Sequence, residues 1–226
     1  MIPARTWLAF GRGALAFGVL LFGSAGTLAW PAAWAYLALF LGGSLLITWT
    51  LARHDPALLE ERMKPLIQKD QPVWDRIILS LLAVLWVAWL ILMGLDAIRF
   101  GWSRMPAWLQ WTGAAGVTTS EYLWYRIVRE NTFLAGVVRI QTERSHRVVS
   151  TGPYAVVRHP LYSSAILFFF ATPLMLGSWW GLAGAVALSA LIIVRTALED
   201  LELQRRLEGY AGYTHRVRYR LVPGLW

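Results

Sequence analysis

Residues 77–95 read IILSLLAVLWVAWLILMGL, a run of nineteen residues that contains no charged side chain. A helix rises about 1.5 Å per residue, so a run of this length crosses the roughly 30 Å hydrocarbon core of a bilayer. Water does not reach that depth, and a helix satisfies its own backbone hydrogen bonds there. This stretch therefore predicts a membrane-spanning helix.

Five further apolar stretches are of similar length. With the first, they occupy Leu8–Leu28, Ala33–Leu51, Ile77–Leu95, Trp108–Tyr125, Leu161–Gly177 and Trp179–Val194. Only Gly177 and Ser178 separate the last two, which predicts a tight helical hairpin, and Pro173 is expected to kink its first arm. We therefore predict an all-α, polytopic transmembrane protein of about six spans.

The composition supports a membrane protein. The chain has 226 residues, of which 57% are hydrophobic and 15% are charged, whereas soluble domains carry about 25% charged residues. We expect a single integral membrane domain over residues 1–226. In it, residues 1–130 form four N-terminal spans with a surface loop, and residues 131–226 form the C-terminal catalytic half. The absence of Cys excludes disulfides and thiolate chemistry.

The basic residues predict the orientation. Of the 21 Lys and Arg residues, all except Arg99 and Arg104 lie at the N-terminus, in the loops after the second and fourth spans, or after the sixth. By the positive-inside rule, both termini and the two long loops are expected to be cytoplasmic, in a bacterial inner membrane. We interpret the net charge of +8 as attracting anionic lipid headgroups, and we expect no nucleic-acid partner. The loop from Pro56 to Trp74 mixes apolar and charged residues, which is typical of a segment on the membrane surface.

The loop before the fifth stretch concentrates the groups that carry chemistry. From Asn131 to Tyr162 it crowds charged residues, His, Gly and Pro. Pro160 falls near the first turn of the next helix, where its missing N–H costs nothing. The free backbone N–H groups and positive dipole end of that helix are suited to an anionic ligand group.

Arg195 and Glu199 lie four residues apart and share one helix face. Two interpretations stay open: an ordinary intrahelical ion pair, or two side chains of an active site. No metal site is expected, because the His residues form no H-E-x-x-H pair. They are scattered along the chain at His54, His146, His159 and His215.

Three motifs in order resemble the isoprenylcysteine carboxyl methyltransferase family, membrane enzymes that use S-adenosylmethionine. The resemblance runs from Asn131 to the C-terminus. Its motifs are Gly152-Pro153-Tyr154 before Arg158-His159-Pro160-Leu161-Tyr162, then Arg195-x-x-x-Glu199-Asp200-x-x-Leu203, then Gly209-Tyr210-x-x-Tyr213. The acidic pair here is Glu-Asp where the family has Glu-Glu, and the segment from Gln141 to His146 is shorter than in eukaryotic members.

The resemblance implies an S-adenosylmethionine-dependent methyltransferase that acts on a lipophilic or prenylated acceptor, by O-methylation of an isoprenylcysteine-like carboxylate. It assigns Arg195 as the catalytic, substrate-side residue. The cofactor-binding positions that it implies are Gln141, His146, Arg147, Val148, Val149, Tyr154, His159, Pro160, Leu161, Tyr162 and Glu199.

Alternatives remain at this stage. Sterol-type membrane reductases that bind NADPH have a similar C-terminal half, including an ending like Tyr219–Gly224, although the acidic Glu199-Asp200 pair favours a cationic cofactor. A non-enzymatic membrane scaffold is the third possibility. The acceptor atom and the oligomeric state stay open. Glu121, inside the fourth stretch, is expected to be a buried acid bonded to a neighbouring helix.

Overall fold

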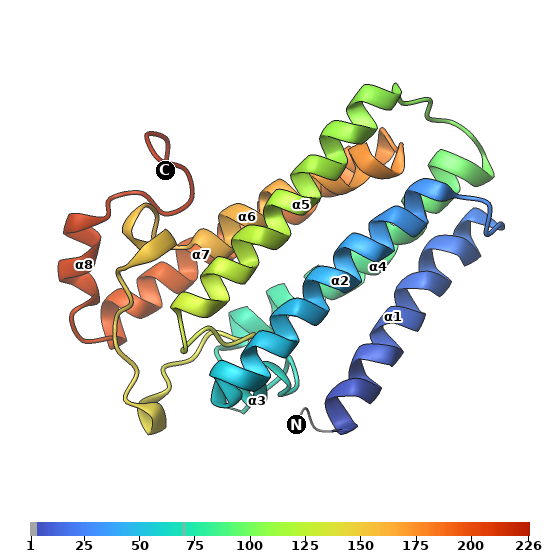
Figure 1. Cartoon of the computed structure of the whole chain (residues 1–226). Coiled ribbons are helices and arrows are strands. Elements are labelled where there is room, and N and C mark those ends of the chain that lie inside the picture. Colours follow the sequence, from blue (N-terminus) through green and yellow to red (C-terminus); the bar gives the residue numbers. More distant parts are fainter. Residues whose placement is uncertain (1–3, 70) are drawn as a thin grey trace.

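The computed structural model describes residues 4–69 and 71–226, and within them all regular structure is helical. Six long helices lie side by side along the molecule (Figure 1). They are α1 (Ala4–Ala25), α2 (Pro31–His54), α4 (Val73–Gly94, continued by the π-helical turn η1, Leu95–Arg99), α5 (Ala107–Glu130), α6 (Pro160–Leu176) and α7 (Trp180–Arg206). The shorter elements are α3 (Pro56–Arg62), η2 (Thr142–Arg144), η3 (Gly152–Ala155) and α8 (Tyr210–Arg216). The prediction of an all-α class is confirmed.

Four of the long helices are long and apolar enough to cross a membrane: Arg5–Ala25, Pro31–His54, Val73–Arg99 and Trp180–Arg206. Helix α6 is apolar but has only 17 residues, or about 25 Å of helix. Helix α5 has the length, but Thr118, Thr119 and Glu121 lower its hydropathy. The chain is therefore an integral membrane protein, and the count of six spans stays a prediction.

Proline and glycine set the helix ends. Pro31, Pro56 and Pro160 each occupy the start of a helix. The N–H groups there have no acceptor within the helix, so the missing N–H of proline costs no hydrogen bond. Helix α6 ends at Gly177, whose φ of 84° lies in the left-handed region. Pro173 falls in the last turn of α6, so it acts on the helix end rather than on the middle of a span.

The two halves of the chain pack into one bundle. Helices α5 and α6 can approach closely at Gly113 because this residue has no Cβ. A Cβ there would overlap the backbone of α6. Helix α4 lies between α1 and α7, and α2 packs on α5. Aromatic rings from five helices (α1, α2, α4, α5 and α6) fill the centre, with Trp86 and Phe168 nearly parallel at 5.9 Å between centroids.

The two ends of the bundle differ. At one end, Asp96 Oδ2 accepts hydrogen bonds from Ser103 (2.6 Å) and Ser178 (2.5 Å), which ties η1 to the turn before α7. At the other end gather α3, the loop of residues 131–159 and α8 (Figure 1). This second end carries the cavity described next.

Candidate functional site

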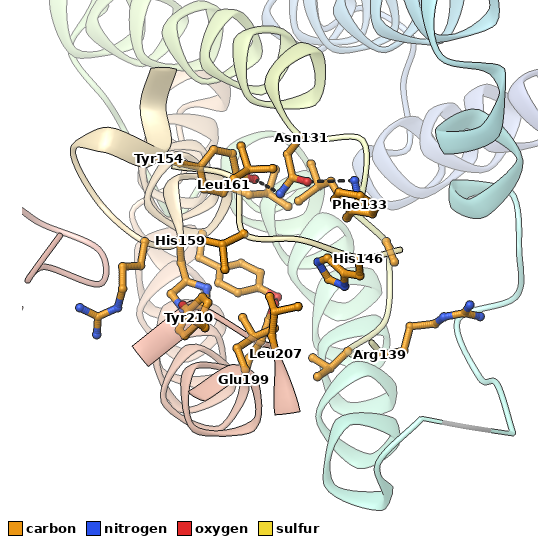
Figure 2. Close-up of a pocket in the computed structure, with 18 of the residues that line it drawn as sticks. Asn131, Phe133, Arg139, His146, Tyr154, His159, Leu161, Glu199, Leu207 and Tyr210 are labelled. Carbon is orange, nitrogen blue, oxygen red and sulfur yellow. Dashed lines mark hydrogen bonds between the residues drawn. The ribbon is translucent and has the colours of Figure 1, made fainter. Parts of the chain in front are cut away.

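A cavity of about 250 Å³ lies among the loop after α5, the start of α6, the last third of α7 and α8. Its wall includes eleven of the twelve side chains that the sequence singled out, and Figure 2 shows several of them around one space. Those eleven are His146, Arg147, Val148, Val149, Tyr154, His159, Pro160, Leu161, Tyr162, Arg195 and Glu199. The fold therefore brings three separate motifs to one site.

Gln141 is the twelfth, and it lies behind the wall with no exposed surface. Its Nε2 donates to the carbonyl of Phe133 at 2.7 Å, and its Oε1 accepts from Arg144 at 2.8 Å. These bonds brace the loop from inside. The structure thus gives Gln141 a supporting position rather than one that faces the cavity.

Arg195 is held by a residue from the N-terminal half. Its Nε donates to Asp75 Oδ1 at 2.8 Å, and its Nη2 donates to the carbonyl of Gly136 at 3.1 Å. Asp75 is fully buried, and its Oδ2 accepts from Gln71 (2.7 Å) and from the backbone N–H of Val138 (3.0 Å). The ion pair that we considered within α7 is therefore not how Arg195 is held.

Glu199 also has its own partner. The hydroxyl of Tyr162 donates to Glu199 Oε2 at 2.5 Å. The Tyr162 ring in turn lies parallel to that of His159, with 5.8 Å between centroids, and beneath the Arg195 guanidinium at 5.4 Å. The carboxylate and the guanidinium are thus fixed separately on one wall.

Asp200, the second acid of the pair, is the centre of a buried network. Its two oxygens accept from Arg158 Nε (2.8 Å) and Nη2 (3.0 Å), the paired geometry that Arg gives a carboxylate. Tyr210 and Arg220 each donate to it at 2.9 Å, and His159 Nε2 lies 3.2 Å away. Burial opposes the charge of Arg158, yet its bonds to Asp200 raise its pKa above the usual value. Asp200 therefore locks the start of α6 to α8 and the C-terminal segment.

Two uncharged polar groups complete the wall. His146 stacks on Phe133 with 4.6 Å between ring centroids. Burial, with a smaller effect of Arg144, lowers the pKa of His146 to about 4, so its imidazole is neutral at pH 7. The Tyr154 hydroxyl accepts from Asn131 Nδ2 at 3.0 Å, as the dashed line in Figure 2 shows. Burial raises the pKa of Tyr154, which therefore stays protonated.

An apolar groove of about 500 Å³ adjoins the cavity. It lies among α2, α3, α4, α5 and α6, and its wall includes Phe40, Trp86 and Phe169. The groove and the cavity share three residues: Arg62, Leu161 and Tyr162. The cavity and the groove therefore lie next to each other.

Glu121 takes no part in the cavity wall. It is 8% exposed, and within residues 4–69 and 71–226 neither carboxyl oxygen has a hydrogen-bond partner. The expected bond to a neighbouring helix is therefore wrong for these residues. Instead its carboxyl packs where Gly43 of α2 lacks a side chain.

Sequence reasoning missed Asp75 and underrated Asp200. Asp75 lies just ahead of the charge-free run at 77–95, but no spacing rule links it to Arg195, 120 positions later. The available signal was weak: an acid at the start of an apolar span needs a partner if the fold buries it. For Asp200 the signal was the run of Arg and Tyr that follows α7.

The model of the phospholipid methyltransferase family matches residues 108–208. That range covers nearly all of α5, the loop with His146, all of α6 and α7, and therefore both Glu199 and Asp200. The isoprenylcysteine carboxyl methyltransferases are part of the same family of membrane methyltransferases, so the resemblance noted in the sequence is confirmed. No curated protein matches the chain.

Proposed function

We propose that this chain, which belongs through residues 108–208 to the phospholipid methyltransferase family of membrane methyltransferases, methylates a carboxylate on a lipophilic acceptor with S-adenosylmethionine. One observation carries the proposal. The cavity wall presents a carboxylate, Glu199, and a guanidinium, Arg195, that are held by different partners. Each is therefore left to face a ligand of opposite charge.

The chemistry of the wall fits the proposed cofactor. S-adenosylmethionine carries two positive groups, a carboxylate, ribose hydroxyls and an aromatic base. Glu199 would accept from its cationic or hydroxyl groups, Arg147 would face its carboxylate, and the stacked Phe133 and His146 offer a flat surface for the base. When bound, the cofactor supplies a methyl group activated by sulfonium sulfur.

Arg195 would orient the acceptor. Asp75 and Gly136 hold its Nε and Nη2, and among the described residues no hydrogen bond uses Nη1. That donor would receive one oxygen of the acceptor carboxylate and leave the other aimed at the methyl group. Transfer would form an O–CH₃ bond and break the S–CH₃ bond, with the electron pair left on sulfur. A carboxylate is already deprotonated, so the residues only need to orient it and exclude water.

The groove accounts for a lipophilic acceptor. The cavity alone, at about 250 Å³, lies below the range of about 300–1,000 Å³ usual for small-molecule sites. With the groove of about 500 Å³, the space falls within that range. An apolar chain can lie there and bring its polar end past Leu161 to Arg195.

N-methylation of a phospholipid amine is the second candidate, because the matching family is described by its phospholipid substrates. Arg195 disfavours it, since a guanidinium beside the acceptor repels an ammonium group. The sterol-type reductase is less favoured, because the family match points to methyl transfer. A non-enzymatic scaffold would need none of the separately fixed charges.

Two experiments test the proposal on the purified chain in lipid nanodiscs. Calorimetric titration should show binding of S-adenosylhomocysteine and none of NADPH. Transfer of a tritiated methyl group to N-acetyl-S-farnesylcysteine or to membrane lipids should give label that alkali releases as methanol, as a methyl ester does. Alkali-stable label on a phospholipid amine would support the second candidate, and absence of S-adenosylhomocysteine binding would reject methyl transfer.

A further inference from the structure

Arg62, the last residue of α3, stands where the cavity and the groove meet. It lines both spaces, together with Leu161 and Tyr162. It is also an exposed residue by its accessible surface. An apolar chain in the groove that reaches for the cavity passes this guanidinium.

Three of the other four arginines of the cavity wall differ from Arg62 because each has an acidic partner. Arg158 pairs with Asp200 at 2.8 Å, Arg195 pairs with Asp75 at 2.8 Å, and Arg139 pairs with Glu61 and Glu143. Only Arg62 and Arg147 have no acidic partner within the part of the chain that the structure describes. Of these two, only Arg62 also lines the groove.

The acid next to Arg62 in sequence is already engaged. Glu61 is 4% exposed, with Lys64 at 2.5 Å and Arg139 at 3.7 Å. The polar contact that Arg62 makes is a long one, from Nη1 to the carbonyl of Leu134 at 3.3 Å. Because a guanidinium carries five N–H donors, this one bond leaves most of them without a partner among the described residues.

We infer that Arg62 is an anion-binding residue for the acceptor, and that the acceptor is an anionic amphiphile whose apolar chain lies in the groove. The inference rests on the proposed function, because it takes the cavity as the site of methyl transfer. The planar, permanently charged guanidinium of Arg suits a carboxylate or a phosphate. A neutral lipid would leave those donors without an acceptor beside an apolar wall.

The test measures ligand binding rather than turnover. The chain in phosphatidylcholine nanodiscs is captured on scintillation-proximity beads with tritiated N-acetyl-S-farnesylcysteine or tritiated dodecyl phosphate, and empty nanodiscs give the background. The first probe represents a carboxylate source and the second a phosphate source. The amide of N-acetyl-S-farnesylcysteine, used as competitor, is the neutral control.

At least one anionic probe should bind, and the amide should compete at least ten-fold more weakly than its parent acid. Arg62→Gln should weaken that binding at least ten-fold. Arg62→Lys, which keeps the positive charge, should weaken it by a smaller factor. Arg206→Gln, which removes an exposed cation that lines neither the cavity nor the groove, should change it by less than two-fold. Affinity for S-adenosylhomocysteine should stay within two-fold in every variant, which shows that the cavity is folded.

Two results would overturn the inference while leaving methyl transfer intact: unchanged binding of the anionic probe in Arg62→Gln, or binding of neither probe by a chain that binds S-adenosylhomocysteine. Failure to bind S-adenosylhomocysteine at all would instead reject the proposed function. The two failures are therefore distinguishable.

Discussion

Replacing Asp75 by Asn tests whether this acid positions Arg195. The carboxylate accepts Arg195 on one oxygen and two N–H groups on the other. An amide has one acceptor, so either Arg195 or the two N–H groups lose their bond. Solvent screens the pair little, because Asp75 has no exposed surface and Arg195 is 6% exposed. Breaking a buried pair costs about 3–5 kcal/mol, and Asn keeps one acceptor, so we expect the low end, about 3 kcal/mol.

For a chain of this size that loss lowers the unfolding midpoint by about 6–12 °C, measured by tryptophan fluorescence in nanodiscs. A displaced Arg195 should also lower turnover about 100-fold, while affinity for S-adenosylhomocysteine stays within about three-fold. Asp96→Asn is the matched control: it is equally buried but lies at the opposite end, so it should lower stability and leave turnover of folded protein unchanged. Full turnover in folded Asp75→Asn, or an equal loss in Asp96→Asn, would refute the positioning role.

Other predictions concern single residues. Arg195→Lys should abolish methyl transfer and keep cofactor affinity within a few-fold, because Lys lacks the planar fork; substantial turnover in this variant would contradict the role of the fork. The folded pKa of His146, about 4, lies below its unfolded value, so its contribution to stability is complete above about pH 6.5 and is lost toward pH 4. His146→Gln should flatten the fall of the unfolding midpoint between those values, and an unchanged pH profile would count against it. Cysteines at the exposed positions Ala29 and Ala107 should react with an impermeant reagent from outside intact cells, and one at Ser145 should be protected, whereas the reverse pattern would contradict the orientation. Glu121→Gln should fold and keep activity because the carboxyl has no bond to lose among the described residues, and complete loss of activity in folded protein would show a catalytic role.

The sequence predicts local features well. Charge-free runs such as 77–95 predict helices because a helix satisfies its own backbone hydrogen bonds where water does not reach. The span count is less certain, since α5 and α6 are helices whose polarity or length falls short of a full span. Hydropathy measures the average of a helix, whereas packing between neighbours, as at Gly113, decides where it lies.

The candidate site likewise has one part that the sequence predicts and one part that depends on long-range packing. Motifs that are continuous in sequence, such as Arg158-His159-Pro160, predict a shared wall because the loop leads directly into α6. Asp75 could not be predicted, because its partner Arg195 is 120 positions away and depends on how α4 packs against α7. The role of Asp200 likewise depends on the C-terminal segment that folds back over the start of α6.

The most direct test of the account is the affinity of S-adenosylhomocysteine for the wild-type chain and for Glu199→Gln, measured by calorimetry in nanodiscs. Glu202→Gln is the matched control, because that acid pairs with Arg206 on the same helix and does not line the cavity. The account predicts binding by the wild-type chain, a loss of at least ten-fold in Glu199→Gln and no change in Glu202→Gln, since a charge-assisted bond in a shielded site is lost only in the first. Equal affinity in all three proteins, or no binding by the wild-type chain, would contradict it.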